Sequence, residues 1–400
     1  MNTGQNLRRC RFLCSAFFVL LLSCCIVTVQ HAAAKTDDQT PRTSQEVNSA
    51  LDTLLAAVTD KTIPLTAENL EPLLELVVGK NATPDSLPQP SKNEAGSGIF
   101  LRDTINVPLT TFLEYCYDPA ISPAALFPAS VRLGHWKPGS DIFAAAPLWK
   151  QAENLNDMHI LRGTEYEEIT PDHFSGCYYG YDLHRLLILM PWNGKRVFIS
   201  VSRQAGPSGV GLKGAIVGDD SDWEYVYTGV EGGTARAIGW MDTYMYDSAS
   251  VTFFFDDETA SRTRYAMFKW LKAGWAGLNV VKKSHIQSGT ERFLKGFKAV
   301  IESPRLPPAG EIATYAEKLK MQPEEEQIAS LARYSARLEE ISAEDSILKR
   351  DDFQQVLRNG GYGASLTAEQ RAGVLVKQYI KHQIGKSPLA GLEQHTQPEG

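Results

Sequence analysis

The stretch LLILMPWNGKRVFISVSR at residues 186–203 decides the fold, because it places a tight turn between two apolar runs. Asn193-Gly194 favours a two-residue β-hairpin turn, since both residue types accept a positive φ. After the turn, two sets of side chains alternate: Val197, Ile199 and Val201 against Phe198, Ser200 and Ser202. This period of two predicts a strand with one buried face and one wetter face, as in an antiparallel sheet.

A strand-forming composition extends outward from this hairpin over residues 99–258, where aromatic and β-branched residues fill short segments between Gly, Asn, Asp and Pro. A short helix is predicted at 108–117, and strands are predicted near residues 99–107, 130–136, 157–168, 174–190, 196–203, 223–229, 235–247 and 250–256. After Thr259 the pattern turns helical, through Trp270 and Trp275 to Ile301. Residues 99–303 are therefore predicted to form one α+β core domain.

Helical segments flank this core on both sides. A helical pair is predicted within residues 35–80, its second helix beginning after Thr66, and a linker at 81–98 follows it. A second linker at 304–310 leads to a charged helical segment at 311–386 and a loose tail at 387–400. Ser342-Ala-Glu-Asp345 and Thr367-Ala-Glu-Gln370 have the spacing of capping boxes.

The order of elements in the core resembles the helix-grip fold of START-type lipid-transfer domains. Ile105-Asn-Val-Pro-Leu-Thr-Thr-Phe-Leu-Glu-Tyr115 is similar to that family's first strand running into its first helix. Ala273-Gly-Trp-Ala-Gly-Leu-Asn-Val-Val-Lys282, continuing to Phe293-Leu-Lys-Gly-Phe-Lys298, is similar to its last helix. The resemblance implies an antiparallel β-sheet that wraps a long C-terminal helix, with a hydrophobic cavity between them.

The chain departs from that family in its long connections at 137–156 and 204–222 and in its additional N- and C-terminal helical segments. The family has no invariant catalytic motif to transfer to this sequence. An antiparallel β-sandwich with helical appendages is the alternative architecture, and fold analogy alone does not decide function.

Residues 1–34 have the order of a signal peptide: basic residues (Arg8, Arg9 and Arg11), an apolar run (12–29) and a small-residue site (His31-Ala-Ala-Ala34). Cleavage near Ala34 would place the mature protein in the periplasm or outside the cell. A retained membrane anchor and a lipid anchor at Cys24 are the alternatives. In an oxidising compartment, Cys116 and Cys177, which remain after cleavage, are predicted to form a disulfide.

Charge and motif content narrow the classes of partner. The formal net charge is −7 without a basic stripe, which argues against nucleic acid. The glycine-rich stretch 206–213 lacks the spacing of a phosphate-binding loop, so no cofactor is expected. His173, Cys177 and His184 are metal-binding residue types, but their spacing matches no established ligand pattern, so no metal is expected either.

Aromatic side chains with a polar tip gather in the later predicted strands and in the helix expected to face them. Such rings line apolar cavities well, because each buries area and offers one hydrogen bond. His285 lies toward the apolar side of its helix. The predicted ligand-binding residues are Tyr225, Tyr227, Trp240, Tyr244, Tyr246, Trp270, Trp275 and His285. The alternative is that the rings fill a core and that His285 is a core histidine.

These features predict an exported protein that binds a hydrophobic or amphipathic small molecule, such as a lipid, between sheet and helix. Residues 311–386 would dock an envelope protein. Two other functions stay open: an envelope hydrolase acting on an ester or a glycan, and a cell-envelope interaction protein without a cavity. The hydrolase would use paired carboxylates, as in the acidic stretches 219–224 and 256–258, or a converging Ser and His.

Overall fold

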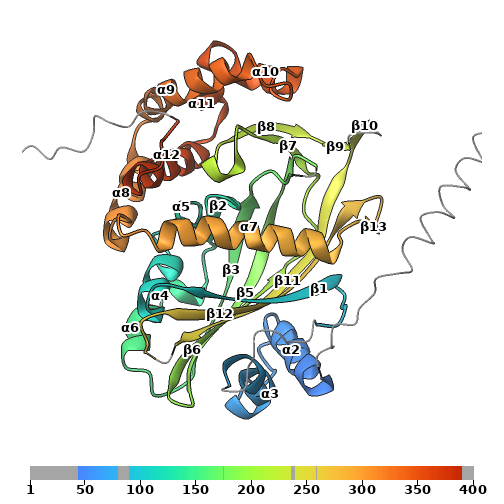
Figure 1. The fold of residues 1–400 in the computed structure, drawn as a ribbon, viewed down its shortest axis with the longest axis vertical. Coiled ribbons are helices and arrows are strands. Elements are labelled where there is room, and N and C mark those ends of the chain that lie inside the picture. Colours follow the sequence, from blue (N-terminus) through green and yellow to red (C-terminus); the bar gives the residue numbers. More distant parts are fainter. Residues whose placement is uncertain (1–43, 80–89, 174, 236–238, 258, 390–400) are drawn as a thin grey trace, which may run out of the picture. The chain divides into compact units, whose positions relative to one another are not determined.

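An antiparallel β-sheet forms the centre of the protein (Figure 1). The computed structural model describes residues 44–79, 90–173, 175–235, 239–257 and 259–389, with only the backbone described for 233–235, 239 and 240. The eight-stranded sheet has the order β1-β12-β11-β6-β5-β3-β2, and β13 pairs with β12. Its strands are β1 (Ser97–Ile105), β2 (Val131–Trp136), β3 (His159–Ile169), β5 (Gly180–Trp192), β6 (Lys195–Gln204), β11 (Thr243–Asp256), β12 (Thr263–Trp275) and β13 (Leu278–Asn279).

The predicted hairpin at residues 186–203 is confirmed as β5 and β6. Trp192 pairs with Lys195 at its end, and the two residues between them have positive φ angles, 47° at Asn193 and 75° at Gly194. This is the backbone conformation that a two-residue hairpin turn requires. The predicted α+β class with a large antiparallel sheet is confirmed as well.

The outer face of the sheet is apolar and is covered by the N-terminal helical pair, α2 (Gln45–Ala57) and α3 (Ala67–Val78). Both helices are capped as the sequence indicates: Ser44 accepts a hydrogen bond from the Val47 amide, and Thr66 accepts one from the Asn69 amide. Their leucines and valines form one buried cluster with outward-facing side chains of the central strands: Leu186, Ile188, Val197, Ile199, Val201, Val251, Phe253, Ala266, Phe268 and Trp270.

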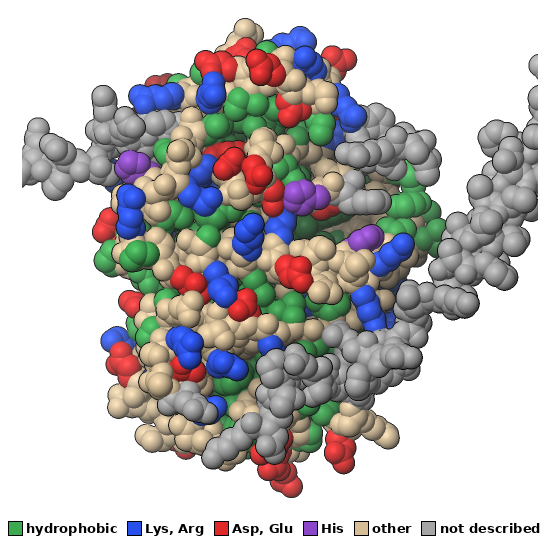
Figure 2. Space-filling view, in the orientation of Figure 1, with side chains coloured by type: hydrophobic (Ala, Val, Ile, Leu, Met, Phe, Trp, Pro, Cys, Tyr) green, Lys and Arg blue, Asp and Glu red, His purple; other side chains and the backbone are tan. Residues whose placement is uncertain are grey.

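The inner face of the sheet is crossed by the long helix α7 (Lys283–Ile301), as Figure 1 shows. The apolar side of α7 is buried, whereas its outward side carries the charged and polar residues that are visible in Figure 2. Shorter helices follow β1 and β2 in the chain: α4 (Leu109–Tyr117) and α5 (Pro123–Leu126) after β1, and α6 (Leu148–Glu153) after β2.

Two smaller sheets stand beside the main one. β4 (Cys177–Tyr178), β7 (Leu212–Ile216) and β8 (Tyr225–Glu231) form a three-stranded antiparallel sheet, and β9 (Gly233–Ala235) pairs with β10 (Gly239–Met241). The long connection at 204–222 therefore contains a strand, β7, that the sequence did not indicate.

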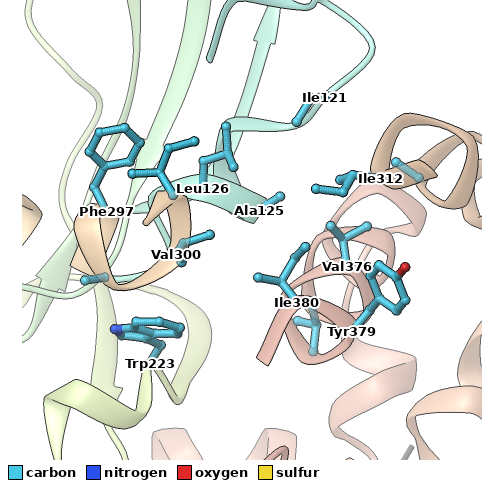
Figure 3. Packing of buried hydrophobic residues seen from close by; sticks show 14 of the residues in the cluster. Ile121, Ala125, Leu126, Trp223, Phe297, Val300, Ile312, Val376, Tyr379 and Ile380 are labelled. Carbon is cyan, nitrogen blue, oxygen red and sulfur yellow. The ribbon is translucent and has the colours of Figure 1, made fainter. Parts of the chain in front are cut away.

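The C-terminal segment comprises α8 (Ala309–Met321), α9 (Glu324–Ser342), α10 (Asp351–Leu357), α11 (Tyr362–Ser365) and α12 (Ala368–Gln383). Its buried side chains belong to the same hydrophobic cluster as those of α4, α5 and α7. In Figure 3, Phe297 of α7 and Val376 of α12 lie on opposite sides of Ala125 and Leu126, so α5 is held between the two helices. Residues 44–389, as far as they are described, thus pack as one unit.

Three sequence predictions of local structure are wrong. Residues 263–275 were expected to be helical, but they form β12, a central strand between β1 and β11. Apolar residues occupy both faces of β12, and such a strand lacks the alternation that separates strand from helix. The stretch 273–282, expected as part of the last helix, instead holds the end of β12 and β13. Ser342 is the last residue of α9 and bonds the Glu339 carbonyl, so it caps no helix start.

Candidate functional site: a cavity beneath α7

A cavity of about 380 Å³ lies between the inner face of the main sheet and α7. This volume falls within the range of small-molecule sites in proteins, roughly 300–1,000 Å³. Its walls come from β3, β5, β6, β11 and β12 on one side and from α4, α7 and α12 on the other. The cavity therefore draws on both the core and the C-terminal segment.

The helix side of the cavity is aromatic. Phe127, which follows α5, stacks on Phe293 of α7 with ring centres 5.1 Å apart, and it lies 4.9 Å from the ring of Phe297. Phe112 of α4 stacks on Phe254 of β11 at 4.2 Å. All five rings line the cavity, with Phe254 on the sheet side, so an apolar guest would bury its surface against them.

The sheet side of the cavity carries small hydroxyl side chains on two central strands. Ser200 and Ser202 of β6 face Thr252 and Ser250 of β11, and the hydroxyls of Ser202 and Ser250 lie 2.7 Å apart. Side chains this small leave the space above the sheet unfilled. The cavity exists because large rings on α7 oppose short side chains on the strands.

A buried ion pair lies in the same wall. Arg185 of β5 bonds Glu165 of β3 at 2.6 Å, and Glu165 is only 5% exposed. Burial raises the pKa of Glu165, while the positive charge of Arg185 opposes that shift. Nearby, Tyr181 donates a hydrogen bond of 2.7 Å to Glu167, and burial raises the pKa of Tyr181 well above its ordinary value.

Lys269 of β12 brings a second positive charge into the cavity. Its ammonium group donates a hydrogen bond of 2.9 Å to the Ser248 hydroxyl. Lys269 forms no ion pair with any residue that the structure describes. Burial lowers the pKa of Lys269, and the charge of Arg185 adds to that shift, whereas Glu167 and Asp247 oppose it.

The cavity opens between the start of α7 and the C-terminal segment. His285, in the first turn of α7, lines the cavity and is exposed, which places it at this opening. Across from α7, His135 of β2 and Glu369 of α12 form an exposed pair at 2.9 Å. Two C-terminal helices supply further lining residues: Ala316 and Lys320 of α8, and Ala372, Gly373 and Val376 of α12.

Cys116 and Cys177 are free thiols in the structure, so the disulfide expected between them is not formed in it. Cys116 of α4 lines the cavity, and burial raises the pKa of its thiol well above the ordinary value. Cys177 of β4 is buried elsewhere, 3.3 Å from the Thr243 hydroxyl.

Of the predicted ligand-binding side chains, His285 lines the cavity, and Tyr225 and Tyr227 do not. Both tyrosines lie on β8 and are buried against the C-terminal segment. The Tyr225 hydroxyl donates to Asp220 at 3.1 Å, and the guanidinium of Arg132 lies 3.8 Å from the ring centre of Tyr227. These two rings fill a core.

Trp270, Tyr244, Tyr246 and Trp275 also lie outside the cavity lining. Trp270 is on the outer face of the sheet, where its ring nitrogen donates to the Ser91 carbonyl at 2.9 Å. Tyr244 and Tyr246 are half-buried and stack on each other at 6.0 Å, and Trp275 is half-buried at the end of β12. The side chain of Trp240 lies outside the described residues.

Four carboxylates of the acidic stretches considered for a hydrolase are engaged in structural ion pairs. Asp220 binds Arg292 at 2.6 Å, Asp256 binds Arg196 at 2.7 Å, and Asp257 binds Arg262 at 2.9 Å. Glu224 is buried with Lys381, Gln378 and Tyr334. His173, part of the metal cluster weighed in the sequence, pairs with Asp220 at 3.2 Å. The described part of the chain contains no group of three or more side chains that would hold a metal ion.

Sequence reasoning missed the charged and hydroxyl residues of the cavity wall. The signal that would have found them is the recurrence of serine or threonine at every second position in two strands, Ser200 and Ser202 followed by Ser248, Ser250 and Thr252. Small polar residues at core-facing positions indicate space that other side chains do not fill.

In comparisons with known proteins, no protein-family model matches the chain, and no curated protein is significantly similar to it. Among the helices that the structure describes, none has the length and apolar character needed to cross a membrane.

Proposed function

We propose that this protein binds an amphipathic, lipid-like small molecule in the cavity beneath α7. The single observation that carries the proposal is the cavity itself, with phenylalanine rings on its helix side and hydroxyl and charged groups on its sheet side. An amphipathic guest matches both walls, because its chain would contact the rings while its polar end reaches the sheet.

The strand order supports the helix-grip resemblance that motivates this function. The first strand pairs with the last long strand, and the strands between them follow in reverse chain order to β2 at the far edge. α7 follows the sheet in the chain and lies over its inner face. We propose that the sheet and α7 form a helix grip, with residues 1–34 acting as an export signal ahead of it.

The cavity favours a binding protein over an envelope scaffold, because a scaffold needs no unfilled space in its core. It also favours binding over hydrolysis. Glu165 is held by Arg185. Outside the cavity, arginines or the C-terminal helices hold Asp220, Asp256, Asp257 and Glu224.

The test is native mass spectrometry of the gently purified protein, combined with extraction of the bound material into organic solvent. We expect a stoichiometric adduct of lipid-like mass. The double variant Ser202→Leu/Ser250→Leu fills the cavity and removes both partners of their hydrogen bond together. It should fold and lose the adduct, whereas Ser330→Leu, an equal change on the exposed side of α9, should keep it.

A wild-type protein without any adduct that also fails to take up dodecanol or dodecanoate would contradict the proposal. So would an adduct that Ser202→Leu/Ser250→Leu retains at full stoichiometry.

A further inference from the structure

We propose that a row of four side chains across the sheet binds the anionic head group of the ligand, a carboxylate or a phosphate, deep inside the cavity. This inference rests on the proposed function and names its ligand class. The row consists of Lys269 on β12, Ser250 on β11, Ser202 on β6 and Arg185 on β5. Each residue of the row lies directly opposite the next on the neighbouring strand: Lys269 with Ser250, Ser250 with Ser202, and Ser202 with Arg185.

The register places all four side chains on one face. Residues that lie directly opposite each other in neighbouring antiparallel strands point to the same side of the sheet. All four line the cavity. Since neighbouring strands are about 4.8 Å apart, the row spans roughly 14 Å from Lys269 to Arg185, with two hydroxyls between the two cations.

Of the two cations in the row, Arg185 has an ion pair and Lys269 has none among the described residues. Arg185 is neutralised by Glu165 at 2.6 Å, and Glu167 accepts a hydrogen bond from Tyr181. Lys269 has the Ser248 hydroxyl as its partner and no ion pair among the described residues. An ammonium group held away from water favours a counter-ion, because burying an unpaired charge is costly. Glu167 and Asp247 favour the charged form of Lys269 but form no ion pair with it, so the head group of the ligand would supply the close counter-ion.

The hydroxyls complete a site for an oxyanion. Ser202 and Ser250 lie 2.7 Å apart, so one of them donates to the other and its partner keeps a hydrogen free to turn toward the cavity. Hydrogen bonds from an ammonium group and a hydroxyl to a charged oxygen are stronger than those between neutral groups. A neutral alcohol in the same place would leave Lys269 unpaired.

The row also fixes the direction in which the ligand lies. The cation is on the sheet, while Phe293 and Phe297 are on α7 and His285 marks the opening. A head group on the row and a chain against the rings match both walls at once. The ligand is therefore a single-chain oxyanion bound with its head inside, and not a lipid held by its head group at the cavity mouth.

The test compares three probes with the same twelve-carbon chain: dodecanoate, dodecyl phosphate and dodecanol. Titrations of the full mature chain, stripped of bound material, give the dissociation constant of each probe. We expect at least one of the two anions to bind tenfold or more tightly than dodecanol. The better anion identifies the head group as carboxylate or phosphate.

Two matched variants locate the effect. Lys269→Met should remove the preference for the anion and keep or improve the binding of dodecanol, because the chain contacts are unchanged. Lys269→Gln serves as a second variant if Lys269→Met folds poorly. Lys295→Met removes the same charge from the exposed side of α7 and should leave all three affinities within twofold of wild type.

The outcomes separate this inference from the proposed function. If dodecanol and the anions bind wild type equally well and Lys269→Met changes nothing, the head-group site is wrong and the cavity binder stands. If an anion preference is lost equally in Lys295→Met, the preference comes from the surface charge, and the row is again wrong. If no probe binds, both proposals fail.

Discussion

Ser202 of β6 and Ser250 of β11 face each other across the centre of the sheet with their hydroxyl oxygens 2.7 Å apart. Their chain neighbours Val201 and Val251 are also cross-strand partners, but these point to the outer face and are fully buried under the N-terminal helices. One pair of strands thus carries a packed core on one side and the floor of a cavity on the other.

Because the two faces differ in packing, truncating adjacent residues of one strand should lower the free energy of unfolding by different amounts. Phe253 lies in the outer core and is fully buried, so Phe253→Ala should lower the free energy of unfolding by about 3–5 kcal/mol. Thr252 faces the cavity, so Thr252→Ala should cost under about 1 kcal/mol, because little packing is lost beside an empty space. Urea unfolding of both variants measures the difference, and equal costs would mean that the inner face is packed like the outer one.

Replacing Arg185 should lower the free energy of unfolding by an amount that depends on whether the Glu165 carboxylate is still present. Arg185→Met leaves the Glu165 carboxylate buried without its cation and should cost about 3–5 kcal/mol near neutral pH. The double variant Arg185→Met/Glu165→Gln should recover at least half of that loss, because the buried charge is gone.

The pH dependence of Arg185→Met follows from the raised pKa of Glu165. A carboxyl whose pKa is higher in the folded state contributes stability at acidic pH that is lost as the pH rises through the folded pKa. The penalty of Arg185→Met should therefore be smaller at pH 5 than at pH 8. A penalty that is the same at both values, or that the double variant does not reduce, would contradict the account.

Lys377 of α12 predicts a change in stability at alkaline pH. Burial lowers its pKa to about 8, although Glu224 opposes the shift, and Lys381 and Arg132 add to it. Between about pH 8 and 10.5 the unfolded chain binds this proton and the folded chain does not, so the contribution of Lys377 to stability increases with pH in this window. The wild type should gain stability relative to Lys377→Met between pH 7.5 and 9.5 in urea titrations. A constant difference between the two proteins would contradict this prediction.

The packing of the C-terminal segment predicts that a chain without it is unstable. Its buried side chains share one cluster with α5 and α7, and Lys381 of α12 forms a buried pair with Glu224. A mature chain that ends at residue 303 should therefore lose cooperative thermal unfolding and bind hydrophobic dyes. If that fragment melts as sharply as the full mature chain, residues 311–386 are an independent arm. Docking of an envelope protein by these residues stays a prediction.

The hairpin, the helical pair and the antiparallel class were predictable because each depends on local sequence. Asn193-Gly194 sets its own turn, and Ser44 and Thr66 cap their helices within three residues. β12 was not predictable in this way. It is covered on both faces, so the alternation that reveals a half-buried strand is missing, and its partners β1 and β11 are identified only by long-range pairing.

The cavity was predicted between sheet and helix, but most of its residues were not. Aromatic content led toward Tyr225, Tyr227 and Trp270, and burial among other side chains explains all three. The residues that leave space are serines, whose effect appears only when neighbouring strands are in register. The pairing of Lys269, Ser250, Ser202 and Arg185 joins positions far apart in the chain, and no local pattern reveals it.

Photo-crosslinking with a fatty acid that carries a diazirine near the end of its chain tests most directly whether the guest lies beneath α7. We expect peptide mapping to place the label on residues around Phe293 and Phe297 and around Phe127, with competition by unlabelled fatty acid and loss of the label in Ser202→Leu/Ser250→Leu. Label confined to the surface helices, such as the region around the exposed Met321, and unchanged in that variant, would contradict a ligand inside the cavity.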